Sequence, residues 1–118
     1  MKKTDTKIIN AEERTLGRVA SEIATVLMGK NKATYERHIY SGFPVKVINA
    51  SKLNTTNKKL EEIYHTKYSG YPGGLRISKG SYTIKTKGYK ELINLAVYHM
   101  LPANKLRREM MKNLKVEE

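Results

Sequence analysis

Hydrophobic residues in the first half of the chain follow two periodicities. The β-branched runs Lys7 to Asn10 and Val45 to Ile48 each predict a strand. Between them, apolar residues recur at steps of three and four after Thr15, which suits an N-cap, and before Gly29, which suits a C-terminal cap. This stripe consists of Leu16, Val19, Ala20, Ile23, Ala24 and Leu27. Strand, helix and strand predict a βαβ unit with parallel strands, and hence an α/β domain.

The second half of the chain has a less regular pattern. Residues Glu61 to Tyr68 are rich in aromatic and β-branched side chains and predict a third strand, whereas Leu75 to Ile84 fits neither a helix nor a strand. Lys90 to Met100 predicts a helix whose buried side carries Leu92, Ile93, Ala96, Val97 and Met100. Lys105 to Leu114 predicts a last helix with an apolar stripe and a separate cationic face.

No internal repeat, low-complexity segment or linker interrupts the 118 residues. We therefore expect one domain over residues 1–118, with short flexible ends at about residues 1–6 and 115–118. No apolar run approaches the roughly 20 residues that cross a bilayer, and the basic start lacks the apolar stretch of a secretory signal. The chain has no cysteine, which suits a reducing compartment. We expect a protein of the cytosol or of an organelle matrix.

Charge narrows the class of function further. The chain has 23 Lys and Arg against 11 Asp and Glu, a formal net charge of +12. No acidic residue occurs between Arg37 and Leu60, or between Ile63 and Lys90. A solvated basic face could explain one such stretch, but two adjacent stretches favour a polyanion partner. Nucleic acid is favoured over a membrane surface, because no basic amphipathic helix presents Trp or Phe.

The patterns expected of catalytic and metal sites are weak. His38, His65 and His99 are separated by 27 and 34 residues, and no cysteine completes a four-ligand zinc site. Carboxylates occur as adjacent pairs such as Glu12 and Glu13, whose side chains would point in different directions. Neither of the glycine motifs that cradle nucleotide phosphates is present. We expect no catalytic residue, no metal ion and no cofactor.

RNA recognition uses cations for phosphates, exposed amides, and flat side chains on which unstacked bases rest. The connection after the first helix and the glycine-rich turn both interleave cations and rings. Glycines in that turn can take positive φ and let an RNA backbone approach, although a plain tight turn is the alternative. The candidate RNA-binding residues are Lys30, Lys32, Tyr35, Arg37, His38, Lys58, Lys59, His65, Lys67, Tyr68, Gly70, Tyr71, Gly73, Gly74, Arg76, Lys79, Lys105, Arg107, Arg108 and Lys112.

Two other classes of function remain open at this point. A hydrolase acting on nucleic acid would use His38 or His65 as a general base. A DNA-binding regulator would use Lys105 to Leu114 as its recognition helix.

Six short blocks of sequence, in a fixed order between Ile8 and Val116, carry a family resemblance. The chain resembles the family of protein thirteen of the large ribosomal subunit, in its bacterial or organellar form. The most specific block is the tyrosine-proline-glycine-glycine turn. The blocks are Asn10 to Glu12, Thr15 to Ser21, Gly29 to Lys32, Val47 to Ala50, Ser69 to Leu75, and Met100 to Pro102.

The resemblance implies a three-layer α/β/α domain around a small, mostly parallel sheet of about four strands. It also implies a structural role, binding large-subunit (23S-type) rRNA during assembly beside neighbouring ribosomal proteins. No enzymatic activity, membrane or small-molecule substrate is expected, and the location is the ribosome of the cytoplasm or of an organelle. The chain departs from the family in lacking acidic residues around Tyr40 to Phe43, and in lacking an apolar helical pattern over Lys79 to Thr86.

Overall fold

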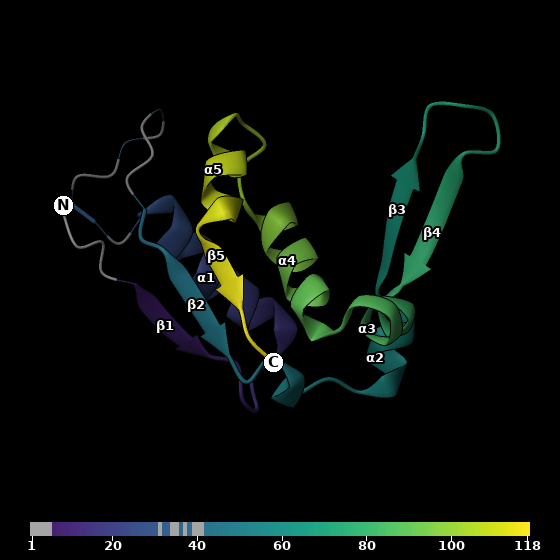
Figure 1. Cartoon of the computed structure of the whole chain (residues 1–118), viewed down its shortest axis with the longest axis horizontal. Coiled ribbons are helices and arrows are strands. Elements are labelled where there is room, and N and C mark those ends of the chain that lie inside the picture. The colour runs from purple at the N-terminus through teal and green to yellow at the C-terminus, as the bar shows by residue number, and fades with distance from the viewer. Residues whose placement is uncertain (1–5, 31, 34–35, 37, 39–41) are drawn as a thin grey trace.

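The computed structural model describes residues 6–30, 32–33, 36, 38 and 42–118. A parallel sheet packs with helices into a body, and a long β-hairpin stands apart from it (Figure 1). The sheet consists of β1 (Lys7–Asn10), β2 (Val45–Ile48) and β5 (Leu114–Val116), in the order β1-β2-β5 with parallel pairing throughout. The predicted strands β1 and β2 and their parallel pairing are confirmed.

Helix α1 (Leu16–Met28) joins β1 to β2 and buries its apolar stripe. All six predicted stripe residues are buried. Thr15 is extended but makes no side-chain cap bond, whereas Gly29 adopts the left-handed conformation (φ 78°) and donates its N–H to carbonyls of the last turn. Glycine takes this conformation without the steric cost that a Cβ brings, which explains why the helix ends there. The predicted helix and its C-terminal cap are confirmed.

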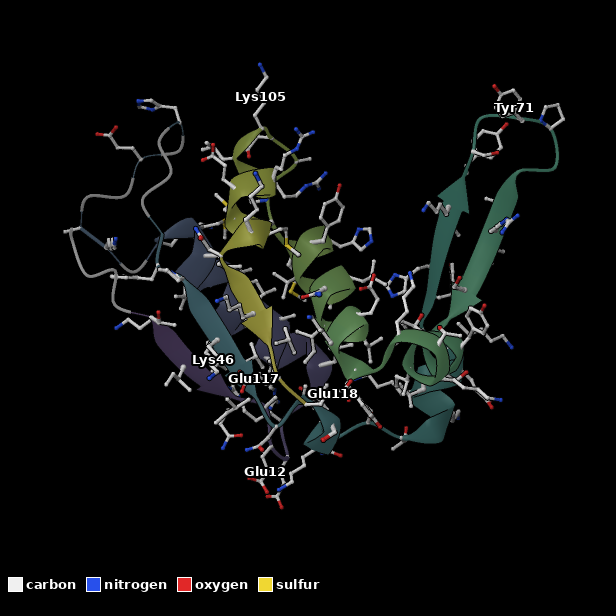
Figure 2. The ribbon with its side chains drawn as sticks, viewed as in Figure 1. Glu12, Lys46, Tyr71, Lys105, Glu117 and Glu118 are labelled. Carbon is white, nitrogen blue, oxygen red and sulfur yellow. The ribbon has the colours of Figure 1, made fainter. Side chains whose placement is uncertain are left out.

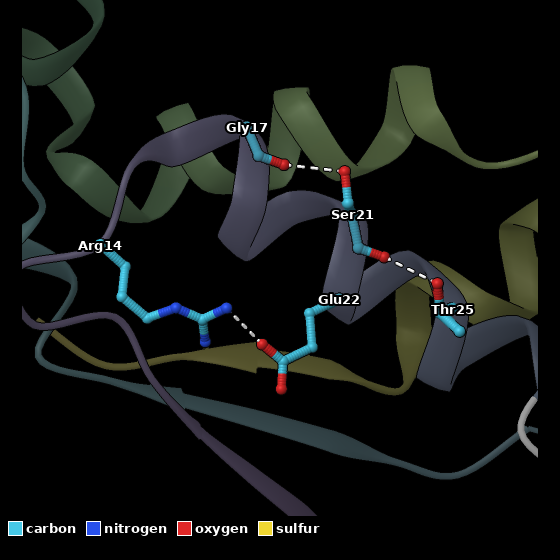
Figure 3. Close-up of polar contacts among 5 residues, drawn as sticks. All are labelled: Arg14, Gly17, Ser21, Glu22 and Thr25. Carbon is cyan, nitrogen blue, oxygen red and sulfur yellow. Dashed lines mark hydrogen bonds and ion pairs between the residues drawn. The ribbon is translucent and has the colours of Figure 1, made fainter.

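The exposed side of α1 is held by local polar contacts (Figure 3). The Ser21 hydroxyl donates to the Gly17 carbonyl at 2.9 Å, and the Thr25 hydroxyl donates to the Ser21 carbonyl at 2.9 Å. The Arg14 guanidinium pairs with the Glu22 carboxylate at 2.5 Å across the start of the helix. Arg14 is therefore already neutralised within the body.

Helix α4 (Tyr89–Met100) supplies the other large part of the core by packing on α1 and against the end of β5. The predicted helix Lys90 to Met100 is confirmed to within one residue. Met100 is an exception to its predicted buried side, because its side chain is 42% exposed. The largest fully buried side chains come from α1, β2 and α4, and are Val19, Ile23, Leu27, Val45, Val47, Leu92, Ile93 and Val97.

Between β2 and α4 the structure corrects the sequence prediction. After the 3-10 turn Ala50–Lys52, helix α2 (Asn57–Glu62) occupies the first two residues of the predicted third strand, and β3 is shorter (Tyr64–Tyr68). The Thr56 hydroxyl accepts from the Lys59 N–H at 3.2 Å, and this cap starts α2.

The segment to which the sequence assigned no element contains two. It forms β4 (Leu75–Lys79) and then α3 (Gly80–Lys87). Helix α3 lacks an apolar stripe because the residues it buries fully are small, Gly80 and Thr83. The prediction that this segment fits neither a helix nor a strand was therefore wrong.

The C-terminal segment is also corrected. Helix α5 (Leu106–Lys112) is shorter than predicted, and Leu114 belongs to β5. Residues 115–118, expected to form a flexible end, include the rest of β5; the Glu117 N–H donates to the Val47 carbonyl at 2.8 Å. Lys46 also pairs with the Glu117 carboxylate at 3.1 Å. Residues 1–5 of the other expected flexible end lie outside the described residues.

The domain is α/β, with a small parallel sheet. Among the described residues this sheet has three strands rather than about four, because β3 and β4 pair with each other in antiparallel fashion and form a separate hairpin. Helices α2 and α3 form the base of that hairpin (Figure 1). The three-layer arrangement stays a prediction. In the described part of the chain, no helix is both long and apolar enough to cross a membrane.

Candidate nucleic-acid interface

The register of β3 and β4 gives the hairpin two different faces. Tyr64 pairs with Lys79 and Tyr68 with Leu75, and successive side chains of a strand point to opposite faces. The outer face therefore carries Tyr64, Thr66, Tyr68, Leu75, Ile77 and Lys79, whose side chains are all exposed. The inner face carries His65, Lys67, Arg76 and Ser78.

The turn of the hairpin presents an aromatic ring at the far end of the molecule (Figure 2). Tyr71 is 76% exposed, and its carbonyl accepts from the Gly74 N–H at 2.9 Å. Gly73 has φ +75° after a proline, the geometry of a type II turn, and Gly70 has φ +89°. The predicted positive φ is confirmed for Gly70 and Gly73. Gly74 has no positive φ; a Cβ there would meet the Ser69 hydroxyl, which can rotate away, and would lie 3.0 Å from the Tyr71 carbonyl oxygen.

A cleft of about 590 Å³, here called the hairpin cleft, separates the inner hairpin face from α3 and α4. Its lining includes rings and hydroxyl groups, and Glu91 is the one carboxylate among the described lining residues. The hairpin contributes His65, Lys67 and Ser78 of its inner face, together with Thr66, which the register assigns to the outer face. The helices contribute Tyr82, Thr83, Thr86, Lys87, Glu91, Leu95, Tyr98 and His99.

His65 and His99 join the hairpin to the body at this cleft. Their rings are parallel within 5°, with centroids 5.9 Å apart, and Tyr98 meets His99 edge-on at 5.6 Å. Burial lowers the pKa of His65 below its ordinary value, and the charge of His99 lowers it further, whereas Glu91 acts in the opposite direction. The Nε2 atom of His65 is buried and has no hydrogen-bond partner among the described residues.

A second cleft of about 700 Å³, here called the α5 cleft, lies where α4 meets α5. Four predicted cations line it: Lys105, Arg107, Arg108 and Lys112. The Arg107 guanidinium lies 3.8 Å from the centroid of the Tyr98 ring and donates to the Tyr98 hydroxyl at 2.7 Å. Tyr98 lines both clefts, so the two clefts are neighbours on α4.

The other predicted residues are not brought to this surface. Lys58 and Lys59 are exposed on α2 and line neither cleft. Lys32 lies 3.8 Å from the centroid of the Phe43 ring, and His38 lies 3.4 Å from the Glu36 carboxylate. Lys30 is exposed beyond the end of α1. Tyr35 and Arg37 lie outside the described residues.

Sequence reasoning missed several cleft residues, above all Tyr82 on α3 and Tyr98 on α4. Their signal was present but weak, since each is a tyrosine outside the buried positions of its helix. Only the tertiary structure brings Tyr98 against Arg107 and beside the hairpin. Among the described residues, no group of three or more His, Asp or Glu side chains is arranged to hold a metal ion.

Comparison with known proteins gives a consistent result. The family model described as "Ribosomal protein L13" matches residues 4–117. The large ribosomal subunit protein uL13 of Caldanaerobacter subterraneus is 50% identical over 109 residues, covering 92% of this chain and 76% of the relative. The protein of the same name from Pelobacter propionicus is 46% identical over 115 residues, covering 97% and 80%. That of Prochlorococcus marinus is 43% identical over 109 residues, covering 92% and 76%.

Proposed function

This chain belongs to the ribosomal protein L13 family, and we propose that it is a structural component of the large ribosomal subunit. The observation that carries the proposal is the match of residues 4–117 to the family, together with relatives named large ribosomal subunit protein uL13. The chain binds 23S-type rRNA, supports assembly of the subunit in the cytoplasm, and catalyses no reaction. The expected three-layer α/β/α arrangement belongs to the same proposal.

The distribution of charge supports an RNA partner. Lys67 and Arg76 on the inner hairpin face have no ion-pair partner among the described residues, and neither do Arg108 and Lys112 at the α5 cleft. Phosphates compete poorly for cations that already have carboxylate partners. These unpaired cations therefore provide the contacts that fix the protein on the RNA backbone.

The outer hairpin face supports a second kind of partner. Tyr64, Tyr68, Leu75 and Ile77 are each about 60% exposed, and Lys79 is the one charged residue on this face. A face with so few charges makes few favourable contacts with phosphates. Burial against the apolar surface of another protein, in contrast, is favourable. Neighbouring proteins of the large subunit therefore complete the set of partners.

Salt-dependent binding tests the proposal. Purified protein is titrated with a 23S rRNA transcript at several salt concentrations, with 16S rRNA as the competitor. The logarithm of the binding constant should fall with the logarithm of the salt concentration, with a slope of about 0.7 to 0.9 per phosphate contact. The double variant Lys67→Gln, Arg76→Gln should therefore lower the size of this slope by about 1.4 to 1.8. The control, Lys46→Gln with Lys52→Gln, also removes two cations, but these are paired with Glu117 and Glu12. A slope near zero, or equal affinity for 16S rRNA, would contradict the proposal.

The same binding assay separates the two other classes of function. A DNA-binding regulator would prefer duplex DNA to structured RNA in a gel shift. A nuclease would cleave the transcript, and His38→Ala or His65→Ala would abolish the cleavage. The shortness of α5, seven residues, makes it a poor recognition helix for a DNA groove.

A further inference from the structure

We propose that the hairpin cleft receives one unpaired nucleobase of the bound RNA, turned out of its helix. This inference rests on the proposed function and names the part of the RNA that the inner hairpin face binds. The α5 cleft holds backbone phosphates beside it, and the Tyr98–Arg107 pair marks the boundary between the two.

The size and the walls of the hairpin cleft suit a flat group. Its volume of about 590 Å³ lies within the 300 to 1,000 Å³ range of small-molecule sites, which is the size class of one nucleotide. Tyr82 of α3 and Tyr98 of α4 present exposed rings from the helical wall, at 59% and 39% exposure. RNA-binding proteins place splayed bases on rings of this kind, because every base has a π-face.

The charges in the cleft distinguish a base from a phosphate. Lys67 and Lys87 lie among the lining residues and can hold the phosphates that flank an inserted nucleotide. Glu91, half-buried in the same cleft, would repel a phosphate but accepts hydrogen bonds from an amino group. The cleft therefore favours a base edge that presents an N–H donor to Glu91, which every one of the four RNA bases can supply.

His65, one of the residues that line the cleft, carries a polar atom without a partner among the described residues. The Nε2 atom of His65 is buried at the junction of the hairpin and α4, with no hydrogen-bond partner among the described residues. Buried polar atoms in finished structures are nearly always hydrogen-bonded, and each exception calls for an explanation. A base in the cleft, which His65 lines, brings donors and acceptors into that space when the ring turns.

Ultraviolet crosslinking of the unaltered chain tests the proposal directly. The complex of the chain with 23S rRNA is irradiated, digested and searched for nucleotide–peptide adducts by mass spectrometry. We expect an adduct at Tyr82 or Tyr98. Adducts confined to residues outside the hairpin cleft, such as Tyr71, would overturn the proposal while leaving RNA binding intact. A chain that binds no rRNA in the same assay would instead refute the proposed function.

A cleft-filling variant provides a second test. Thr86→Phe adds a ring inside the cleft without changing charge, and Thr25→Phe makes the same change on α1. The two threonines match well, since both are exposed and both donate their hydroxyls to the carbonyl four residues earlier. Because the added ring of Thr86→Phe fills the cleft and excludes the base, the stacking contact is lost and rRNA binding should weaken about tenfold. Thr25→Phe lies outside the cleft and should leave rRNA binding unchanged.

The outcome of the variant is read together with circular dichroism, which reports whether each variant folds. Equal affinity of folded Thr86→Phe and Thr25→Phe for 23S rRNA would overturn the proposal. If Thr86→Phe does not fold, the crosslink on the unaltered chain decides the question by itself.

Discussion

The body and the hairpin place apolar and charged side chains in opposite ways. In the body, Val47 and Leu92 are fully buried, and the Lys46 ammonium pairs with a carboxylate. In the hairpin, Ile77 is 62% exposed, and Arg76 has no ion-pair partner among the described residues. A two-stranded hairpin is at best marginally stable in water by itself. The body therefore depends on its own core, whereas the hairpin leaves apolar and cationic side chains exposed, where the proposed partners would contact them.

Two leucine substitutions should show this contrast at its largest. Leu92→Ala removes a fully buried side chain from α4, so the free energy of unfolding should fall by about 2–5 kcal/mol. Leu75→Ala makes the same change on the hairpin, where the side chain is 59% exposed. This variant should alter the free energy of unfolding by less than about 0.5 kcal/mol. Urea unfolding followed by circular dichroism measures both. Similar losses in the two variants would mean that the hairpin's outer face is part of the core.

Two glycine-to-alanine substitutions should change stability in opposite directions. Gly73→Ala places a Cβ on a residue with φ +75° in the hairpin turn, which should cost about 1–2 kcal/mol locally. Gly17→Ala in α1 meets no atom within 4 Å and should stabilise the body by up to about 1 kcal/mol. Amide hydrogen exchange localises the first effect to β3 and β4, and thermal unfolding measures the second. A stabilising Gly73→Ala would contradict the turn geometry.

Removing one arginine from each region should give smaller effects. Arg14→Gln breaks the ion pair with Glu22 and should lower the free energy of unfolding by about 0.2–1 kcal/mol at low salt. Arg76→Gln breaks no ion pair of the described chain and should leave unfolding unchanged while weakening rRNA binding. Unfolding measured at low and at high salt checks the prediction for Arg14→Gln. Salt screens the ion pair, so the difference in stability between the variant and the unaltered chain should disappear at high salt. Equal destabilisation by both variants would reveal a partner for Arg76.

The weakest expected effect concerns pH at the junction of the two regions. Because the pKa of His65 is lowered in the folded state, mainly by burial and also by His99, the unfolded state binds a proton more readily. Stability should be fully present above the ordinary value of 6.5 and should decrease as the pH falls below it towards the folded pKa. His65→Gln should flatten this dependence. Unfolding midpoints between pH 5 and 8 provide the measurement.

Periodicity in the sequence predicted the elements whose burial is one-sided. β1, α1, β2 and α4 each carry an apolar face that contacts the core, so their patterns matched their structures closely. β4 and α3 escaped prediction because neither buries a large apolar side chain fully. β5 escaped because three residues, one of them buried, are too short to form a pattern. Its place depends on hydrogen bonds to β2, which is distant in the chain.

The candidate interface was only partly predictable for a related reason. The hairpin cations, the glycine turn and the α5 cations follow from composition and local order. The two clefts do not. In the hairpin cleft, β3 faces α4, which is distant in the sequence, through His65 and His99. In the α5 cleft, Arg107 meets Tyr98 only because the chain turns between α4 and α5. A tyrosine on a helix gives no sequence signal of which cation or ring will lie against it.

Strand β5 also has a consequence for how the molecule folds. Val45 pairs with Leu114 in the central strand of the sheet, so one side of β2 stays without its partner until nearly all of the described chain is available. Pairings of such long sequence separation close slowly, because the chain between them loses configurational freedom first. During synthesis, the open edge of β2 must wait until residues 114–116 have been made. We expect α1 and the β1–β2 pair to form first and the pairing of β2 with β5 to follow.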